Sequence, residues 1–376
     1  MRRSSLTAIA GLLGVVLAGW PTTAHGQSLA ARIRADARRS DFSGTILVER
    51  DGRTLFHEGF GLADRSFAIP ARADTRYKIA SITKAFTAAL VLQLHEEGKV
   101  DLDASIRRYL PAYRGDGAER VTLRQLLNHT SGIENFDQVK TLEEAVTKGI
   151  PAYQLPHTTD QLLEEYSSGK VRGEPGKVFD YNNADYVILG KVIERVVGAA
   201  YDSVLAQRIL RPLAMTNTGM LNWRDVVPRL APTYMKVGNG VPLIHDLPVY
   251  PENWYAAGAL YSTTSDLLKF AQALYGGRLL KPESLTLMLT PGLDEYGFGL
   301  WARSVDIDGR PHRVAQRPGG IMGANTLMLR YLDDGVTVII LGNTDAADVD
   351  ALGFAIGRHV LAKGRAAPAA GPRGTR

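Results

Sequence analysis

The chain has 376 residues, of which 45% are hydrophobic and 22% are charged, and its formal net charge is +5. This is the composition of a globular protein with enough apolar residues for a large core. The positive charge lies at the two ends, because residues 27–361 alone carry a net charge of −1. The composition therefore excludes a strongly basic body of the kind that binds nucleic acid, and the absence of cysteine excludes disulfides.

Residues 1–26 have the pattern of a secretory signal peptide. Two arginines precede an apolar run over residues 6–20, and Ala24 and Gly26 supply small side chains before a cleavage point at Gln27. We predict that the signal is removed, which leaves no stable membrane span and a periplasmic or secreted protein. The alternative is an anchor helix that stays uncleaved.

The first predicted element of the body is a β-hairpin over residues 43–61. Apolar and polar residues alternate on both sides of Asp51-Gly52, a pair suited to the positive φ angles of a tight turn. A helix is predicted next, over residues 81–97, where apolar residues recur at helical spacing and Gly98 provides the stop. From about residue 101 to 290 the pattern indicates short helices separated by turns rich in proline and glycine.

The last third returns to strands. Residues 300–307 and 310–315 flank Asp308-Gly309, residues 325–331 and 337–341 flank Asp334-Gly335, and a helix is predicted over residues 349–361. Strands at both ends with helices between them predict an α+β fold. We expect one antiparallel sheet from the N- and C-terminal strands, flanked by helices, with a helical lobe inserted and the active site between sheet and lobe.

Residues 362–376 follow the last helix and are rich in alanine, proline and glycine, with four basic residues and no acidic ones. Such a segment cannot bury enough apolar surface to order itself, so it is predicted to be a disordered basic tail. Residues 27–361 then form one domain, since no internal repeat or long linker divides them.

Several familiar sites are absent from the sequence. It contains no Gly-x-Ser-x-Gly nucleophile elbow and no phosphate-binding Gly-x-x-x-x-Gly-Lys-Ser/Thr loop. Its eight histidines are scattered without the spacing of metal ligands. We therefore expect neither a metal nor an organic cofactor.

The segment Ser81-Ile82-Thr83-Lys84 is the candidate for chemistry. A serine hydroxyl becomes a nucleophile when a nearby base takes its proton, and a buried lysine among other cations can serve. Residues three apart share a helix face, and the helix N-terminus offers backbone N–H groups to a developing oxyanion. A second copy, Ser167-Ser168-Gly169-Lys170, is interpreted as chance because glycine makes a common helical face improbable there.

Proton relay to the leaving group needs a third residue, and Tyr181 with Asn183 is the candidate pair. A tyrosine beside lysines can carry a proton, and an asparagine can bind both a lysine and a substrate carbonyl. Taken alone, Tyr181 fits a core or turn position better than a catalytic one; the pairing with Ser81 and Lys84 is what favours catalysis.

At this point the sequence resembles the serine β-lactamase and penicillin-binding-protein superfamily, in the branch of class C β-lactamases, D-Ala-D-Ala carboxypeptidases and β-lactamase-like esterases. The resemblance covers nearly all of the body and rests on five segments: DTRYKIASITKAFTAALVLQLHEEGKVDLD, VTLRQLLNHTSGI, EPGKVFDYNNADYVILGKVIERVVG, AAGALYSTTSDLLKFAQAL and YGFGLW. It implies that Ser81 is the acylated nucleophile, Lys84 its proton acceptor, Tyr181 the second acid/base and Asn183 a substrate-orienting group. It also implies that residues 129–132 are structural.

The third motif of this family departs from the usual Lys-Thr-Gly or His-x-Gly. The matching residues are Arg317-Pro318-Gly319, so the hydroxyl that anchors a substrate carboxylate is missing. Arg317 keeps a positive charge and could pair with a carboxylate, and Gly319 permits close approach of a substrate. The alternative is a shifted alignment that leaves Arg317 a surface strand residue. The N–H groups of Ser81 and Gly320 are the expected oxyanion hole.

The sequence thus predicts a secreted serine hydrolase that cleaves an amide or ester bond of a small-molecule or peptide substrate through an acyl-enzyme on Ser81. The alternative is a penicillin- or peptidoglycan-binding protein without turnover, which the altered third motif motivates. The pattern leaves open whether the substrate is a β-lactam, a D-amino-acid peptide or an ester, and it does not determine the oligomeric state.

Overall fold

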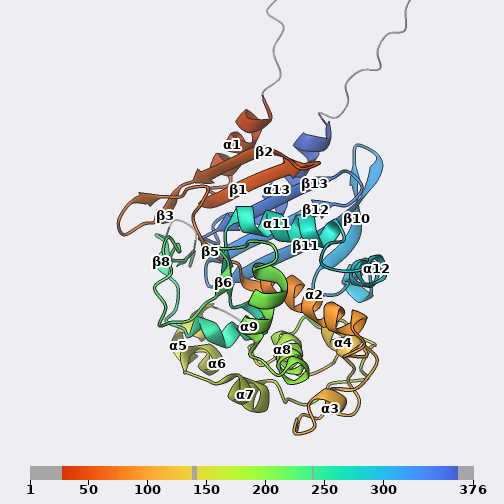
Figure 1. The fold of residues 1–376 in the computed structure, drawn as a ribbon. Coiled ribbons are helices and arrows are strands. Elements are labelled where there is room, and N and C mark those ends of the chain that lie inside the picture. Colours follow the sequence, from red (N-terminus) through yellow and green to blue (C-terminus); the bar gives the residue numbers. More distant parts are fainter. Residues whose placement is uncertain (1–27, 138–141, 239–240, 363–376) are drawn as a thin grey trace, which may run out of the picture.

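The computed structural model describes residues 28–137, 142–238 and 241–362 (Figure 1). The predicted signal peptide at residues 1–26 lies outside the described residues, as does the predicted tail except for Ala362.

A six-stranded antiparallel sheet joins the two ends of the chain, as predicted. Its strand order is β10-β11-β12-β13-β1-β2, so the N-terminal hairpin pairs with the last strand through β1 and β13. The strands are β1 (Gly44–Arg50), β2 (Arg53–Phe60), β10 (Trp301–Ile307), β11 (Arg310–Ile321), β12 (Ala324–Tyr331) and β13 (Val336–Gly342). The predicted α+β class is confirmed.

The predicted hairpin turns are present at both ends of the sheet. Asp51 and Gly52 have φ angles of 51° and 83°, and Asp308 and Gly309 have φ angles of 54° and 75°. Positive φ at both central residues gives a turn whose twist suits the strands on either side. One strand differs from prediction: β11 continues six residues beyond Ala315, to Ile321, and this extension carries the third motif.

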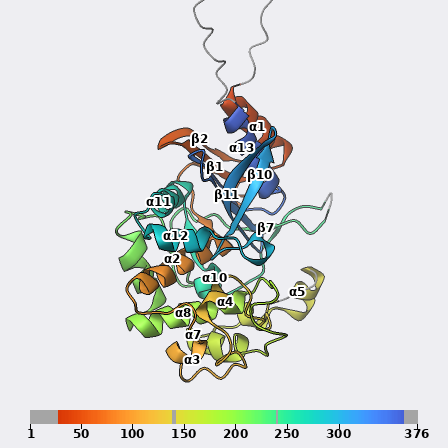
Figure 2. The ribbon, with the colours of Figure 1, turned by 90° about the vertical axis from the view of Figure 1, so that its right-hand side faces the viewer.

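Two hydrophobic cores use opposite faces of the sheet. Side chains such as Ile46, Val338 and Ile340 pack with helices α1 (Leu29–Arg39) and α13 (Val349–Ala362). Their strand neighbours, including Leu47 and Ile339, point to the other core, which contains the remaining long helices. Because side chains alternate between the two faces of the sheet along each strand, both faces are buried. In Figure 2, helices α11 and α12 lie to one side of the strands.

The helical lobe occupies the middle of the chain and lies below the sheet in Figure 1. Its helices and those that border it are α3 (Ile106–Tyr109), α4 (Leu123–Leu127), α5 (Leu142–Lys148), α6 (Pro151–Gln154), α7 (Thr159–Gln161), α8 (Asn183–Val197), α9 (Tyr201–Leu205), α10 (Tyr255–Gly258), α11 (Thr264–Tyr275) and α12 (Pro282–Leu289). Short strands complete the fold: β3 (Leu62–Asp64), β4 (Ile69–Pro70), β5 (Tyr77–Lys78), β6 (Gly219–Met220), β7 (Tyr234–Met235), β8 (Ile244–His245) and β9 (Leu260–Ser262).

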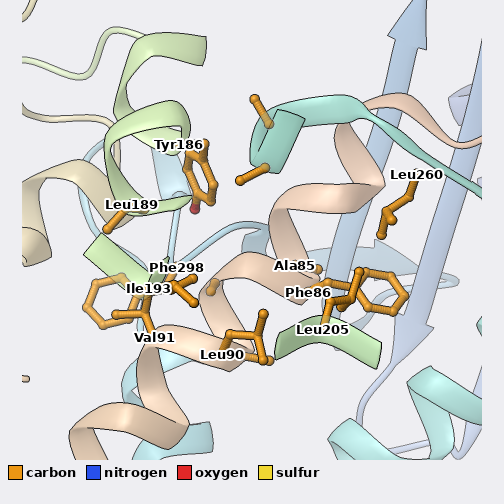
Figure 3. Close-up of a cluster of buried hydrophobic side chains, with 14 of the residues drawn as sticks. Ala85, Phe86, Leu90, Val91, Tyr186, Leu189, Ile193, Leu205, Leu260 and Phe298 are labelled. Atoms are coloured by element: carbon orange, nitrogen blue, oxygen red, sulfur yellow. The ribbon is translucent and has the colours of Figure 1, made fainter. Parts of the chain in front are cut away.

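Helix α2 (Thr83–Glu96) runs through the core between sheet and lobe. Figure 3 shows Phe86 and Leu90 of this helix among side chains from several other elements, including Ile193 of α8. Phe86 stacks on Phe270 of α11 with ring centroids 3.7 Å apart. Burial on nearly every side fixes the N-terminal end of the helix, which the candidate nucleophile directly precedes. Among the described residues, no helix is both long and apolar enough to cross a membrane.

Candidate active site

Ser81 lies in a turn just before α2, in contrast to the predicted helix start at this residue. The turn is the short 3₁₀ helix η1 (Ala80–Ile82), and regular α-helix begins at Thr83. The reason is the backbone of Ala80, whose φ of 47° is incompatible with a right-handed helix. Ser81 is nevertheless within one turn of the helix, and its side chain stays half-buried while Ile82 and Thr83 are buried.

Strand β11 passes unusually close to this turn at Gly319. A Cβ atom built on Gly319 would lie 2.5 Å from the carbonyl oxygen of Ile79 and 3.1 Å from the backbone nitrogen of Ser81. Only glycine fits such an approach without displacing one of the two segments. Thr326 of the neighbouring strand lies at this junction, where its hydroxyl hydrogen has two carbonyl acceptors within reach, Ile79 at 3.1 Å and Gly319 at 3.0 Å from Oγ1.

Lys84 is fully buried and points to Ser81 from the first turn of α2. Its Nζ lies 3.2 Å from Ser81 Oγ, 2.6 Å from Asn183 Oδ1 and 2.9 Å from the carbonyl oxygen of Ala257. Burial lowers the pKa of Lys84, and the positive charge of Arg317 lowers it further, whereas Tyr181 acts in the opposite direction.

Tyr181 lies on the other side of the serine, with its Oη 2.8 Å from Ser81 Oγ. The segment after it forms the start of α8, where Asn182 caps the helix by accepting from the N–H of Ala184 at 2.8 Å. This cap fixes the backbone from which Tyr181 reaches Ser81 and Asn183 reaches Lys84. The structure thus brings together Ser81, Lys84, Tyr181 and Asn183, the four residues that the sequence combined.

Arg317 lies beneath this cluster, and its side chain is only 1% exposed. The guanidinium donates from Nη2 to Tyr181 Oη at 2.7 Å, and from Nη1 to Tyr296 Oη at 2.8 Å. The planar group also lies over the rings of Tyr181 and Trp301, 5.5 Å and 5.3 Å from their centroids. The predicted contact between Arg317 and a substrate carboxylate would therefore compete with Tyr181 and Tyr296, which already accept hydrogen bonds from the guanidinium.

The charges around Tyr181 decide its protonation. Burial acts to raise the pKa of Tyr181, but the positive charges of Arg317 and Lys84 outweigh burial and lower it to about 8. A phenolate at this position is thus accessible near neutral pH. The other tyrosine on the guanidinium behaves differently, because burial is the dominant effect there and raises the pKa of Tyr296.

The remaining predicted residues take distinct places. Gly320 is exposed at the mouth of the site, where a Cβ atom would meet nothing within 4 Å. Its part in an oxyanion hole stays a prediction. Pro318 is half-buried and lies beyond Gln316, the last residue of β11 that pairs with β10. The missing N–H of proline therefore interrupts no hydrogen bond with that strand.

Three groups that contact the candidate active-site residues were not identified from the sequence. The carbonyl of Ala257 and the phenol of Tyr296 come from segments that signal the fold family but carry no chemical motif of their own. Asp137 accepts a hydrogen bond on Oδ2 from Asn183 Nδ2 at 2.6 Å. The sequence carried no signal for it, because the resemblance implied only a structural role for the preceding residues 129–132.

His129, Ser131 and Asp185 form another buried polar cluster next to the site. Ser131 Oγ donates to Asp185 Oδ1 at 2.6 Å, and His129 Nδ1 lies 3.0 Å from Asp185 Oδ2. Burial raises the pKa of Asp185 well above its ordinary value. Burial also lowers the pKa of His129 well below its ordinary value, and the charges of Lys84 and Arg317 act in the same direction.

The other Ser-x-x-Lys segment forms no comparable site. Ser167 is fully buried, whereas Lys170 is exposed, so the two side chains face different environments. Across residues 28–137, 142–238 and 241–362, no group of three or more His, Asp or Glu side chains is arranged to hold a metal ion.

Comparison with known proteins agrees with this geometry. The family model described as Beta-lactamase matches residues 29–360. Esterase EstB of Burkholderia gladioli is 30% identical over 372 aligned positions, which cover 84% of this chain and 91% of the esterase.

Two solved structures are similar over most of their length. A penicillin-binding protein from Bacillus halodurans has a TM-score of 0.72 and 28% identity, covering 86% of this chain and 98% of that one. A D-stereospecific amidohydrolase from Streptomyces has a TM-score of 0.69 and 29% identity, covering 82% and 91%. The motifs, the fold and these similarities together show that the chain belongs to the beta-lactamase family.

Proposed function

We propose that this protein is a serine hydrolase that cleaves an amide or ester bond through an acyl-enzyme on Ser81. The observation that carries the proposal is the set of partners around Lys84 Nζ. Asn183 Oδ1 and the Ala257 carbonyl can only accept, so each requires a hydrogen from the amine. A neutral amine has two hydrogens. When Lys84 donates one to Asn183 Oδ1 and the other to the Ala257 carbonyl, its lone pair faces Ser81 Oγ.

The first chemical step follows from that arrangement. Ser81 Oγ bonds to the substrate carbonyl carbon while its proton passes to Lys84 Nζ, and the carbonyl electron pair moves onto oxygen. The lowered pKa of Lys84 makes the neutral, accepting form available before substrate arrives. The backbone N–H groups of Ser81 and Gly320 are our candidates for binding the oxyanion.

The leaving group departs on the side of Tyr181. As the bond from carbon to nitrogen or oxygen breaks, Tyr181 gives its phenol proton to the leaving atom and is reprotonated from Lys84. Water then attacks the acyl-enzyme, its proton returns through the same pair, and the acid is released with Ser81 restored. A pKa of about 8 for Tyr181 suits a group that must both give and take a proton.

In this scheme Arg317 acts through Tyr181. An arginine cannot exchange a proton near neutral pH, and its buried fork already contacts the phenol oxygen at 2.7 Å. We propose that it holds Tyr181 in place and stabilises the phenolate. The alternative of a direct bond to a substrate carboxylate would require the guanidinium to leave Tyr181 or Tyr296.

The relatives support the reaction class. One is named an esterase and another an amidohydrolase, and the acyl-enzyme chemistry described above can hydrolyse both esters and amides. The pattern of residues 1–26 supports export, so we propose a periplasmic or secreted location. A penicillin- or peptidoglycan-binding protein without turnover is the competing proposal, motivated by Pro318 in place of a hydroxyl residue.

Mass spectrometry tests the proposal. The purified protein is incubated with a penicillin or an activated ester, quenched in acid and digested. An acyl group on the peptide containing Ser81 is expected, and it should be absent from Ser81→Ala. Labelling that is unchanged in this variant contradicts the assignment, while a stable adduct with no turnover on any ester, amide or lactam favours the binding protein.

A further inference from the structure

Asp137 places a carboxylate at the inner end of the candidate site. Its Oδ2 accepts from Asn183 Nδ2 at 2.6 Å, and the same asparagine accepts from Lys84 on Oδ1 at 2.6 Å. Tyr153, which is buried, also donates to Asp137 Oδ2. One amide group therefore separates the carboxylate from the catalytic lysine.

The carboxylate has a free oxygen and partial access to solvent. Within the described part of the chain, both hydrogen bonds to Asp137 fall on Oδ2, which leaves Oδ1 for a ligand. The side chain is half-buried, as is Asn183. A positively charged donor that approaches Asn183 from the solvent would thus meet a carboxylate oxygen, and charge-assisted hydrogen bonds are stronger than neutral ones.

The cationic side chains of the site are not arranged to receive an anion. Lys84 and Arg317 are fully buried and hydrogen-bonded to protein groups, and Pro318 contributes no hydroxyl. A substrate carboxylate would find no described partner comparable to the one that Asp137 offers a cation.

The surface beside Asp137 is also rich in negative charge. A hollow of about 590 Å³ begins at its neighbour Phe136 and contains the carboxylates of Glu134, Glu165 and Asp180. Its one arginine, Arg172, is paired with Glu134. The local potential therefore favours a positively charged group over a negative one.

We infer that this site selects substrates with an ammonium group close to the attacked carbonyl, such as aminoacyl amides and esters, and that Asp137 recognises the ammonium. The inference rests on the proposed function, because it assumes that Ser81 attacks that carbonyl. An α-ammonium is two bonds from the carbonyl carbon, and Asn183 connects this carboxylate to the site, because its amide contacts both Lys84 and Asp137. Asp137 is thereby a specificity-determining residue.

The competing explanation is that Asp137 only positions Asn183. A carboxylate on Nδ2 fixes which end of the amide faces Lys84, and such a role would affect every substrate equally. A test must therefore compare substrates that differ only in charge. We choose three probes at pH 6.5: alanine p-nitroanilide with a free ammonium, its N-acetyl derivative and its N-succinyl derivative, each as both enantiomers. At this pH most of the α-ammonium stays charged.

For the wild type, kcat/KM should fall from the ammonium to the acetyl to the succinyl probe. Asp137→Asn keeps an acceptor for Asn183 and Tyr153 but removes the charge. The ammonium-to-acetyl ratio should drop about tenfold or more, the effect of losing one charge-assisted hydrogen bond. Asp180→Asn is the matched control, since it removes a charge at the same surface without touching Asn183, and the ratio should stay within about twofold. Asp137→Glu should recover part of the preference.

The outcomes separate the two claims. Hydrolysis of p-nitrophenyl acetate that depends on Ser81, without a preference for the ammonium probe, overturns the inference and leaves the proposed function standing. An equal loss on all probes in Asp137→Asn overturns it in favour of positioning. A ratio that falls as much in Asp180→Asn overturns recognition by Asp137 in favour of the general surface charge. No Ser81-dependent turnover of any probe overturns the proposed function and the inference together.

Discussion

Two polar clusters lie side by side in this protein, and each contains a serine and a titratable partner. The Ser81 cluster includes Lys84 and Tyr181, and the Ser131 cluster includes Asp185 and His129. By residue type the Ser131 cluster is the more similar to a hydrolase triad. By geometry it is not one. In a triad the serine hydroxyl donates to the histidine, whereas Ser131 donates to Asp185.

Charge and access separate the clusters. Asp185 is fully buried, and burial raises its pKa and favours the neutral acid, so the Ser131 cluster is a sealed network. In the Ser81 cluster, the charges of Lys84 and Arg317 lower the pKa of Tyr181 to about 8, and Ser81 itself is half-buried. In the proposed function, what distinguishes Ser81 is therefore the positive charge around its proton relay and its partial exposure, more than the residue types beside it.

The largest expected effect comes from removing each serine in turn. Ser81→Ala should lower kcat/KM by at least about 1,000-fold, because the nucleophile is lost and only binding contributions remain. Ser131→Ala should stay within a few-fold of the wild type in activity but lose about 1–3 kcal/mol of unfolding free energy, since a buried acceptor on Asp185 is left unpaired. Steady-state kinetics measures the activity of both variants, and urea unfolding measures their stability. Equal losses of activity would contradict the distinction between the Ser81 and Ser131 clusters.

The approach of β11 to the serine gives the next largest effect. Gly319→Ala would place a methyl group 2.5 Å from the Ile79 carbonyl, which pushes the strand from the nucleophile turn. We expect a loss of roughly 10- to 100-fold in kcat, as displacements near 1 Å cost that much at reacting groups. Gly320→Ala is the matched control with open space around it and an intact N–H, so its loss should be clearly smaller. Similar kcat values for both variants would contradict the steric argument.

How far the sequence predicted these features depends on whether the interaction was local. The hairpins at Asp51-Gly52 and Asp308-Gly309 were predictable because two adjacent residues determine the turn. The spacing of Ser81 and Lys84 predicted their contact, since one helical turn separates them. Tyr181 lies a hundred residues from Ser81, so no local spacing predicted their contact; its chemical suitability suggested it and the family resemblance strengthened it.

The sequence could not give what depends on three-dimensional packing. The start of α2 was misplaced because Ala80 has a positive φ of 47°, which no pattern in the neighbouring sequence predicts. The burial of Arg317 depends on Tyr181, Tyr296 and Trp301, which come from two other regions of the chain. Asp137 and its bond to Asn183 were missed for the same reason.

Arg317→Met tests whether charge is what makes the Ser81 cluster reactive. Loss of the guanidinium removes a positive charge 2.7 Å from Tyr181 Oη, so the pKa values of Tyr181 and Lys84 should both rise. The low-pH limb of kcat/KM should then move up by about one pH unit or more, with roughly tenfold lower activity at pH 7. Arg317→Lys retains a charge and should shift the limb less. A lower rate with an unmoved limb in Arg317→Met would indicate a purely structural role.

The smallest expected effect tests the Ser131 cluster, through the stability of Asp185→Asn. The N–H of Asn182 donates to His129 Nδ1 at 3.2 Å, so that nitrogen is an acceptor and a protonated Asp185 must be the donor at 3.0 Å. An asparagine amide reproduces both bonds, donating to His129 and accepting from Ser131. The substitution thus replaces a carboxylic acid with a neutral group of the same shape and polarity.

The raised pKa of Asp185 fixes the sign of the pH effect. Above the ordinary pKa of aspartate, near 3.9, the unfolded chain releases this proton while the folded chain keeps it. The unfolded state then binds fewer protons, so the contribution of Asp185 to stability falls as pH rises, until the folded-state pKa is passed. Asp185→Asn lacks this loss and should be the more stable protein at pH 7, by about 1–3 kcal/mol, with the difference shrinking towards pH 4. Urea unfolding at pH 4, 5.5 and 7 measures it, and a difference that grows towards low pH would mean that Asp185 is ionised in the fold and that the Ser131 cluster is charged like the Ser81 cluster.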